Sequence, residues 1–216
     1  MTGKERILDL ACGYGRHSLV FARKGFSVTG VDITKAYIED AKKTAQEQSL
    51  DATFTLADIR DITFENEFDV VLNLDDGAIG YLEDDEENLK IFDVIAKALK
   101  AGGKHFMSIN NADYADRYFP TTNCEIGTKM LTIWQYGWDA KTRLMTLGAY
   151  NIHYGEIALK PQIDMDNANP MRLYSLAELK LIFQKRGMKT ITSYSNYTEN
   201  ESTNKELVLN VYSIKQ

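Results

Sequence analysis

Hydrophobic and polar residues follow two different periods along the first half of the chain. Short apolar runs of the kind found in buried parallel strands alternate with amphipathic stretches of helical period. The predicted strands are residues 6–10, 26–32, 52–56, 68–73 and 105–109. The predicted helices are residues 15–24, 34–48 and 84–101, the last of them ended by Gly102 and Gly103. Strands and helices that alternate through short connections predict a parallel sheet with helices on both faces, which is an α/β fold.

The pattern changes between about residue 112 and residue 172. Residues 132–138 and 147–154 alternate with period two, and residues 139–142 between them have the composition of a turn. This predicts an antiparallel β insertion of two or three strands after the fifth strand of the sheet. We expect the insertion to lie on the substrate side of the domain.

The α/β pattern returns after the insertion and completes one domain. Ser175-Leu176-Ala177-Glu178 has the form of a capping box, which marks the start of a helix. The remaining predicted elements are a helix over 176–186 and strands over 189–195 and 205–214. A chain of 216 residues, 44% of them hydrophobic, can bury the core of such a domain, so we expect residues 1–216 to form a single unit.

Net charge and cysteine content exclude several classes of function. The formal net charge is −6, which disfavours nucleic acid as a partner because phosphate backbones attract basic surfaces. No apolar run reaches the roughly 18 residues of a membrane span, and the N-terminus lacks the apolar region of a signal peptide. The two cysteines, Cys12 and Cys124, are too few for a disulfide framework. These features predict a cytoplasmic protein without a membrane partner.

The first predicted strand runs directly into a turn that contains two glycines and then into a helix. Gly13 and Gly15 let the backbone approach a ligand closely, and the helix N-terminus offers N–H groups to an anion. Asp32 ends the next strand, near the offset of about 20 residues expected for a carboxylate that binds ribose hydroxyls. A nucleotide site is predicted; a plain turn and a dinucleotide site are the alternatives. Ser18 stands where a dinucleotide site needs its third glycine.

The stretch from Leu8 to His17 resembles motif I of the class I S-adenosylmethionine-dependent methyltransferases, D/E-x-A/G-x-G-x-G. Four further stretches are similar to later landmarks of that family, in the same order: residues 28–33, 57–61, 68–74 and 99–103. The resemblance covers residues 6–110 and 175–214. It implies a Rossmann-like sheet of order 3-2-1-4-5-7-6 with the last strand pair antiparallel. It also implies S-adenosyl-L-methionine as cofactor, and the insertion is similar to that of small-molecule N-methyltransferases.

The chemistry of this cofactor assigns roles to residues at the ends of the predicted strands. Its carboxylate can meet the N-terminus of the first helix and Arg16. Its ammonium can meet the carbonyl of Ala11 or, through water, Asp9. Its two ribose hydroxyls can both donate to Asp32. All of these positions lie at carboxyl ends of strands, where open α/β sheets bind ligands.

The adenine and methionine parts of the cofactor have expected contacts further along the chain. Asp58 can accept from the adenine amino group, while Ile33 and Ile59 pack against the faces of the ring. Asn73 and Leu74 follow the fourth strand, beside the methionine part. The residues expected to hold the cofactor are therefore Asp9, Ala11, Gly13, Gly15, Arg16, Asp32, Ile33, Asp58, Ile59, Asn73 and Leu74.

We call the edge of the sheet where the carboxyl ends of the strands lie the rim. Several charged residues near this rim have two interpretations each. Arg60 either pairs with a neighbouring acid, Asp61 or Asp58, or serves the ligand site. Asp75 and Asp76 either bind a substrate amine or a metal, or belong to a solvated loop. No cluster of cysteine and histidine has the spacing of metal ligands, so the sequence predicts no metal site.

Tyr81 and His153 are the candidates for the catalytic machinery. Tyr81 follows the fourth strand and is expected to line the substrate pocket. His153 lies on the insertion, where it either takes a proton from a substrate ammonium or is passive. The insertion also carries aromatic residues that form a wall around the substrate, pack on the core or contact a dimer partner: Trp134, Tyr136, Trp138, Tyr150 and Tyr154.

The predicted function is methyl transfer from S-adenosyl-L-methionine to a nitrogen or oxygen nucleophile of a small molecule. The alternatives are a cofactor-binding or regulatory module without catalysis, and a nicotinamide-dependent oxidoreductase. A homodimer through the insertion is a further expectation. Members of the family carry tens of residues before motif I, whereas the first strand here starts by Arg6. We therefore expect a more open site, a truncated chain or a partner that covers the cofactor.

Overall fold

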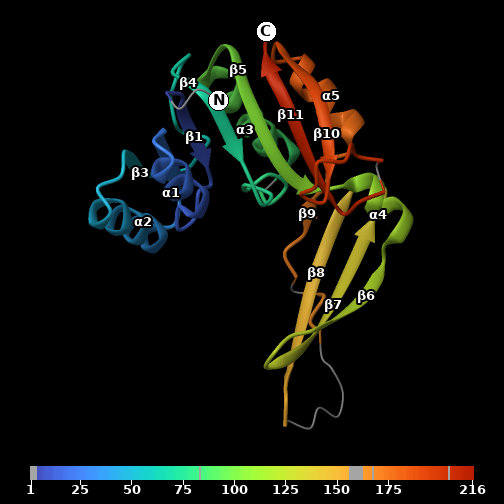
Figure 1. Cartoon of the computed structure of the whole chain (residues 1–216). Coiled ribbons are helices and arrows are strands. Elements are labelled where there is room, and N and C mark those ends of the chain that lie inside the picture. Colours follow the sequence, from blue (N-terminus) through green and yellow to red (C-terminus); the bar gives the residue numbers. More distant parts are fainter. Residues whose placement is uncertain (1–3, 83, 156–162, 167, 204) are drawn as a thin grey trace.

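The computed structural model describes residues 4–82, 84–155, 163–166, 168–203 and 205–216. Its larger sheet has the strand order β10-β11-β5-β4-β1-β2-β3 (Figure 1). The strands are β1 (Arg6–Leu10), β2 (Ser27–Asp32), β3 (Ala52–Leu56), β4 (Phe68–Asn73), β5 (Leu99–Asn110), β10 (Met188–Ser195) and β11 (Val208–Lys215). Strands β1 to β5 pair in parallel, and β11 is antiparallel to both β5 and β10. The predicted order 3-2-1-4-5-7-6 is confirmed.

The helices around this sheet are α1 (Arg16–Arg23), α2 (Lys35–Glu47), α3 (Asp85–Ala98) and α5 (Leu176–Gln184). Successive residues of a strand point to opposite faces of the sheet. In β1, Ile7 therefore packs with Ala22 of α1, whereas Leu8 belongs to the core that α3 and α5 cover. Helices α1 and α2 lie on one face and α3 and α5 on the other, as predicted for an α/β fold.

Two local predictions about helix ends have different outcomes. The capping box is confirmed, because Ser175 Oγ accepts from the backbone of Glu178 at 3.2 Å while the Glu178 carboxylate accepts from Ser175 N at 2.8 Å. The prediction that Gly102 and Gly103 end the preceding helix was wrong. Helix α3 ends at Ala98, and Leu99 is already extended and fully buried where it pairs with Phe68. Tertiary burial of the leucine overrides its helical spacing.

The insertion forms a second sheet of order β6-β7-β8-β9, all antiparallel, that projects from the α/β body (Figure 1). We call its four strands the β arm: β6 (Thr121–Ile126), β7 (Met130–Asp139), β8 (Leu144–His153) and β9 (Met171–Arg172). The predicted hairpin is β7 and β8, and the structure adds a strand on each side. Helix α4 (Ala112–Tyr118) connects the β arm to β5. Arg172 N donates to Gly80 O at 2.8 Å, which joins the β arm to the loop after β4.

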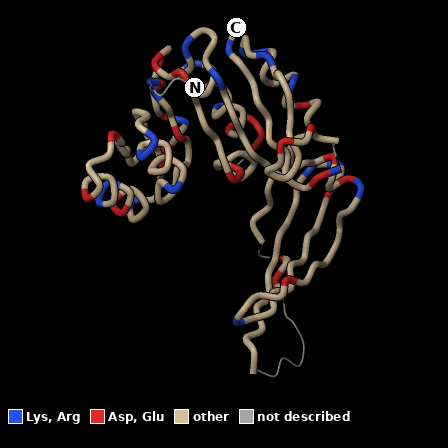
Figure 2. Tube along the Cα trace, in the orientation of Figure 1, with Lys and Arg blue, Asp and Glu red and all other residues tan. Residues whose placement is uncertain are grey.

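Charge is distributed unevenly between the body and the β arm. Lys, Arg, Asp and Glu are interspersed over the α/β body, and few of them lie along the strands of the β arm (Figure 2). Strands β6, β7 and β8 carry only two charged residues, Glu125 and Asp139. The longest helix in the described ranges is α3 with 14 residues, and none of the described helices is long and apolar enough to cross a bilayer.

Candidate functional site

The glycine-bearing turn between β1 and α1 is held against the end of β2. Cys12 N donates to Val31 O at 3.0 Å, and Gly15 N donates to Cys12 O at 2.9 Å. Gly15 has φ +73°, and a Cβ there would lie 2.8 Å from the Phe54 ring, so only glycine fits. The position of Gly13 is different, because a Cβ there would meet nothing within 4 Å. One side of the turn is therefore packed against the core and the other is open to a ligand.

Asp32 lies at the carboxyl end of β2 and binds this turn. Its Oδ2 accepts from Gly13 N at 2.9 Å, and its Oδ1 accepts from Thr34 N at 2.8 Å. A carboxylate has about four acceptor positions, so two remain for a ligand. The structure thus brings Asp32 and Gly13 together, as the sequence predicts, and gives Asp32 a second task in ordering the turn.

Asp9 is a buried carboxylate directly beneath the same turn. It is 2% exposed, and its Oδ2 accepts from Ser18 Oγ at 2.6 Å. Burial raises the pKa of Asp9 to about 6, and the negative charges of Asp32 and Asp75 act in the same direction. Ser18, the residue in place of a third glycine, is fully buried and serves as the donor to this carboxylate.

The raised pKa of Asp9 predicts a defined dependence of stability on pH. The ordinary pKa of the group is 3.8 and its folded value is about 6, so between these values the folded chain holds a proton that the unfolded chain has lost. The contribution of Asp9 to stability therefore falls as the pH rises from 4 through 6. Asp9→Asn keeps the shape and the bond from Ser18 but buries no charge. We expect it to raise the free energy of unfolding by up to about 3 kcal/mol at pH 7.5 and to change it little at pH 4.

Denaturant unfolding of the wild-type and Asp9→Asn chains at pH 4, 6 and 7.5 measures this difference. The exposed Asp61→Asn is the matched control, for which we expect no such dependence. An Asp9→Asn effect that stays constant across the pH range would contradict the assignment of a raised pKa to Asp9.

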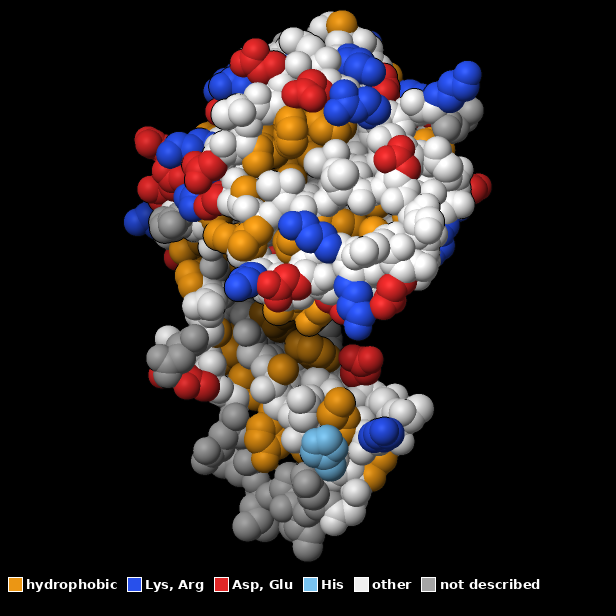
Figure 3. Space-filling model, turned by 90° about the vertical axis from the view of Figure 1, so that its left-hand side faces the viewer, with side chains coloured by type: hydrophobic (Ala, Val, Ile, Leu, Met, Phe, Trp, Pro, Cys, Tyr) orange, Lys and Arg blue, Asp and Glu red, His pale blue; other side chains and the backbone are white. Residues whose placement is uncertain are grey.

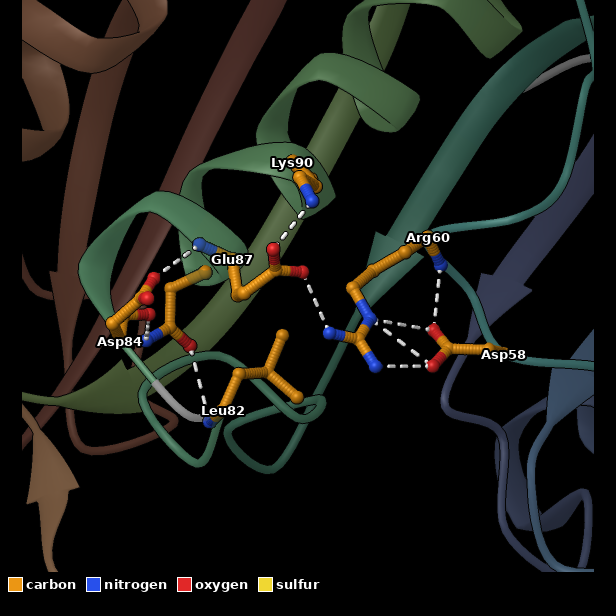
Figure 4. A network of polar contacts seen from close by, with 7 residues as sticks. Asp58, Arg60, Leu82, Asp84, Glu87 and Lys90 are labelled. Atoms are coloured by element: carbon orange, nitrogen blue, oxygen red, sulfur yellow. Dashed lines mark hydrogen bonds and ion pairs between the residues drawn. The ribbon is translucent and has the colours of Figure 1, made fainter.

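Asp58 is ordered by an arginine on its own loop (Figure 4). The backbone N of Arg60 donates to Asp58 Oδ1 at 2.8 Å, and its guanidinium Nη2 donates to Oδ2 at 2.6 Å. These bonds lower the pKa of Asp58. Arg60 Nη1 also donates to Glu87 Oε2 at 2.7 Å. Of the two acids expected beside Arg60, the structure selects Asp58 and adds Glu87 from α3, which no local pattern indicates.

The predicted adenine contacts Ile33 and Ile59 lie in different surroundings. Ile33 is 68% exposed at the end of β2, beside Asp32, although it is a large apolar residue. Ile59 is 6% exposed and packs in the core beneath α3 and α5. The structure therefore brings only Ile33 to the open side of the rim.

Asn73 and Leu74 end β4 and lead into the loop 75–81. Asn73 is fully buried and its Nδ2 donates to Gly77 O at 2.9 Å, so it shapes the loop from below. Asn73 Oδ1 has no hydrogen-bond partner among the described residues. Leu74 is half-buried and packs on the α1 side of the sheet.

Asp76 and Tyr81 form a pair within this loop. Asp76 Oδ1 accepts from Asn110 N at 2.9 Å, and Tyr81 Oη donates to Asp76 Oδ2 at 3.4 Å. Burial raises the pKa of Asp76 to about 6. Burial and the Asp76 charge raise the pKa of Tyr81 to about 12. Tyr81 lies at the predicted rim, but at neutral pH its hydroxyl is a donor and not a base.

Arg16 and Asp75 connect the glycine-bearing turn to the loop after β4 and to the loop between β10 and β11. The guanidinium of Arg16 forms an ion pair with Asp75 Oδ2. Tyr197 Oη, from the loop between β10 and β11, donates to Asp75 Oδ1 at 3.1 Å. The sequence pattern does not indicate Tyr197, which lies in a polar segment 122 residues from Asp75.

His153 is not brought to this rim. It pairs with Met130 at one end of the hairpin, whereas Leu144 at the other end of β8 pairs with Arg172 beside Gly80. A strand of ten residues is about 30 Å long, and that length separates His153 from the loop after β4.

The aromatic residues of the β arm do not form a single wall. The strand register places Trp134, Tyr136 and Trp138 on one face and Tyr150 on the other, because Ile133 is the partner of Tyr150. Tyr136 stacks on Phe119 with ring centroids 4.8 Å apart, and Trp138 Nε1 donates to Asp116 at 3.0 Å. Tyr154 lies beyond β8 and donates to Gly127 O at 2.7 Å. The core-packing alternative is therefore correct for Tyr136 and Trp138.

Comparison with known proteins agrees with this arrangement. Residues 7–103 match the family model described as "Methyltransferase domain". YqeM of Bacillus subtilis (strain 168), named as a methyltransferase, is 32% identical over 134 residues, which are 61% of this chain and 53% of the relative. A ubiquinone biosynthesis O-methyltransferase of Pelagibacter ubique (strain HTCC1062) is 29% identical over 134 residues, 62% of this chain and 54% of the relative.

The fold has counterparts among solved structures. An S-adenosylmethionine-dependent methyltransferase from Clostridium acetobutylicum ATCC 824 superposes with a TM-score of 0.78 and 16% identity, over 99% of this chain and 85% of that chain. This chain spans about half the length of the curated relatives it matches. Residues 7–103 therefore match a methyltransferase domain, and the chain as a whole has a fold that S-adenosylmethionine-dependent methyltransferases of known structure share.

Proposed function

We propose that this chain transfers a methyl group from S-adenosyl-L-methionine to a nitrogen or oxygen atom of a small molecule. The hydrogen bond from Gly13 N to Asp32 at 2.9 Å is the observation that carries the proposal. This bond joins the turn, which has open space for a ligand at Gly13, to a carboxylate that still has free acceptor positions. A curated relative that acts in ubiquinone biosynthesis as an O-methyltransferase supports a small-molecule acceptor.

The residues on the open side of the rim fit the chemical groups of the cofactor. The turn at Gly13 has room for a ligand, and the Asp32 carboxylate has acceptors for the two ribose hydroxyls. Asp9, buried beneath the turn, is largely charged at neutral pH and is assigned to the ammonium through water. The exposed side chain of Ile33 offers an apolar surface to adenine. We assign the carboxylate to the N-terminus of α1, close to Arg16.

The protein's contribution to the reaction is to bind, orient and exclude water. The bound cofactor supplies a methyl group that its sulfonium already activates, so little acid–base chemistry is needed. Turn, strand ends and the loop 75–81 hold the reactants in place, and positioning and desolvation supply most of the rate. Of the two catalytic candidates, Tyr81 is proposed to act through Asp76: its hydroxyl, which its pKa of about 12 keeps neutral, donates to that carboxylate and helps to shape the loop 75–81.

The β arm is proposed to border the substrate side of the domain, next to the loop 75–81. Figure 3 shows the molecule from the side that is on the left in Figure 1. In this view there is a hollow between the α/β body and the β arm, with apolar side chains in it.

The β arm is also proposed to contact a second copy of the chain, because strands β6 to β8 carry few charges. Sedimentation of the purified chain measures whether that dimer forms, and a monomer at all concentrations would exclude it.

Calorimetry with S-adenosyl-L-methionine, S-adenosyl-L-homocysteine and NADH tests the function. We expect both sulfur compounds to bind at micromolar concentrations and NADH not to bind. A methyl-transfer screen over small amines, amino sugars and phenols then identifies the acceptor. Binding of NADH without either sulfur compound would favour an oxidoreductase, and binding of the sulfur compounds without transfer to any acceptor would favour a regulatory module.

A further inference from the structure

A cavity of about 620 Å³ lies on the α1 face of the sheet, beyond the part that α1 covers. Its floor is formed by Phe106 of β5, Tyr194 of β10 and Asn210 of β11, and its edge by residues 197–199 of the loop between β10 and β11. The volume is within the range of about 300–1,000 Å³ that is typical of small-molecule sites. None of the aromatic residues singled out on the β arm lines this cavity.

Asn210 is the most unusual group that lines the cavity. Its side chain is 1% exposed, and neither Oδ1 nor Nδ2 has a hydrogen-bond partner in the described part of the chain. Buried polar groups nearly always have partners, and those that do not require an explanation. Ser108, which faces Asn210 across the strand pair, uses its hydroxyl to accept from Asp75 N at 2.8 Å instead. The carboxamide therefore keeps an unused donor and an unused acceptor beside the floor of the cavity.

The cavity is connected to the glycine-bearing turn through Asp75. Tyr197, at the edge of the cavity, donates to Asp75 Oδ1 at 3.1 Å, and the other oxygen of Asp75 pairs with Arg16 at the start of α1. Gly15, the second glycine of the turn, precedes Arg16 in the chain. One carboxylate therefore contacts both the turn and the cavity.

The charges and ring faces of the cavity define the kind of ligand it suits. Among the described residues that line the cavity, Glu199 is the charged one, and none is a lysine or arginine. Phe106, Tyr194 and Tyr197 present aromatic rings, which attract cations and pack against apolar groups. Asp75 adds a second negative charge near Tyr197, although Arg16 balances it. A carboxylate or phosphate would face Glu199 without a compensating cation.

We propose that this cavity is the acceptor site and that the acceptor is a small primary or secondary amine on an apolar or aromatic body. The inference rests on the methyl-transfer function proposed above. The ammonium form pairs with Glu199, the body packs against the three rings, and a polar substituent bonds to the Asn210 carboxamide. Glu199 first accepts a proton from the ammonium and passes it to water, which frees the nitrogen lone pair. That lone pair then forms the N–C bond to the methyl group while the C–S bond breaks and its electron pair stays with sulfur.

Direct binding of three ring compounds tests the proposal: benzylamine, benzyl alcohol and benzoate, titrated into the whole chain by NMR or calorimetry. We expect benzylamine to bind at least tenfold more tightly than benzyl alcohol and benzoate not to bind. Glu199→Gln should weaken benzylamine about tenfold, equivalent to about 1.4 kcal/mol, and leave benzyl alcohol unchanged. Glu201→Gln is the matched control, because this nearby carboxylate lies outside the cavity. Equal binding of the three compounds, or equal effects of the two variants, would overturn the proposal.

Titration of S-adenosyl-L-homocysteine into the same samples separates the two hypotheses. A chain that binds this product but not benzylamine overturns the amine site and leaves the methyl-transfer function intact. A chain that binds benzylamine but neither sulfur compound overturns the role of the cavity as an acceptor site. Glu199→Gln should not change the affinity for S-adenosyl-L-homocysteine, because the assigned cofactor contacts lie on the other side of Asp75.

Asn210→Leu distinguishes a ligand-binding carboxamide from a structural one. Leucine has a similar size and removes the unpartnered polar atoms, so we expect the thermal midpoint to rise by about 3 °C. The affinity for an amine with a polar substituent, 4-hydroxybenzylamine, should fall at least fivefold, whereas that for benzylamine should change less. A lower thermal midpoint with unchanged affinity for 4-hydroxybenzylamine would show that Asn210 is structural.

Discussion

Asp32→Ala is expected to weaken the binding of S-adenosyl-L-homocysteine by 100-fold or more. The carboxylate is proposed to accept from both ribose hydroxyls, and hydrogen bonds to a charged group contribute about 1.5–3 kcal/mol each. Loss of two such bonds amounts to about 3–6 kcal/mol, and each 1.4 kcal/mol is a factor of about ten in affinity. The substitution also leaves Gly13 N and Thr34 N without their acceptor, so the turn loses its order. Calorimetry on the purified variant measures the affinity.

Two further variants show whether the effect is specific to Asp32. Asp51→Ala removes an exposed acid next to the opposite end of the sheet and should change the affinity less than twofold. Asp32→Asn keeps the shape but replaces one acceptor by an NH₂ group that faces a backbone N–H, so we expect an intermediate loss. An affinity of Asp32→Ala within threefold of the wild type would exclude Asp32 as the ribose-binding group.

Gly80→Ala is expected to lower the free energy of unfolding by about 3–5 kcal/mol, near the upper end for single substitutions. Gly80 has φ +91°, and a Cβ there would lie 2.2 Å from the carbonyl oxygen of Arg172. The residue cannot move away easily, because its N donates to Asn88 Oδ1 at 2.7 Å and its O accepts from Arg172 N at 2.8 Å. The added methyl group therefore separates the β arm from the loop after β4. Denaturant unfolding measures the loss.

Gly102→Ala is the control for backbone conformation alone. Gly102 has φ +73°, but a Cβ there would meet nothing within 4 Å. Alanine at this position carries only the strain of a left-handed residue, about 1–2 kcal/mol. Equal destabilisation by Gly80→Ala and Gly102→Ala would mean that the contact between Gly80 and Arg172 contributes nothing, and that the β arm is held by other contacts.

The sequence by itself determined the features that depend on local pattern. Apolar runs predicted β1, β3 and β4 with the bounds that the structure has, and the spacing from Gly15 to Asp32 predicted one end of the site. Gly13 and Asp32 were predicted to act on the same ligand, and the two residues are hydrogen-bonded. The strand bounds and the proximity of Gly13 and Asp32 could be predicted because parallel strands bring their carboxyl ends to one edge, which turns spacing along the chain into proximity in space. The shared ligand stays a prediction.

Only the tertiary structure decided which side chains meet across long separations. The Arg60 partner Glu87 comes from another element, and Tyr197 reaches Asp75 from near the C-terminus. Strand pairing between β7 and β8 places His153 at the far end of the β arm, away from the rim. Local periodicity states which face a residue occupies but not what packs on that face. The sequence predicts Asn210 only as part of a strand. The structure shows that its buried carboxamide has no hydrogen-bond partner among the described residues.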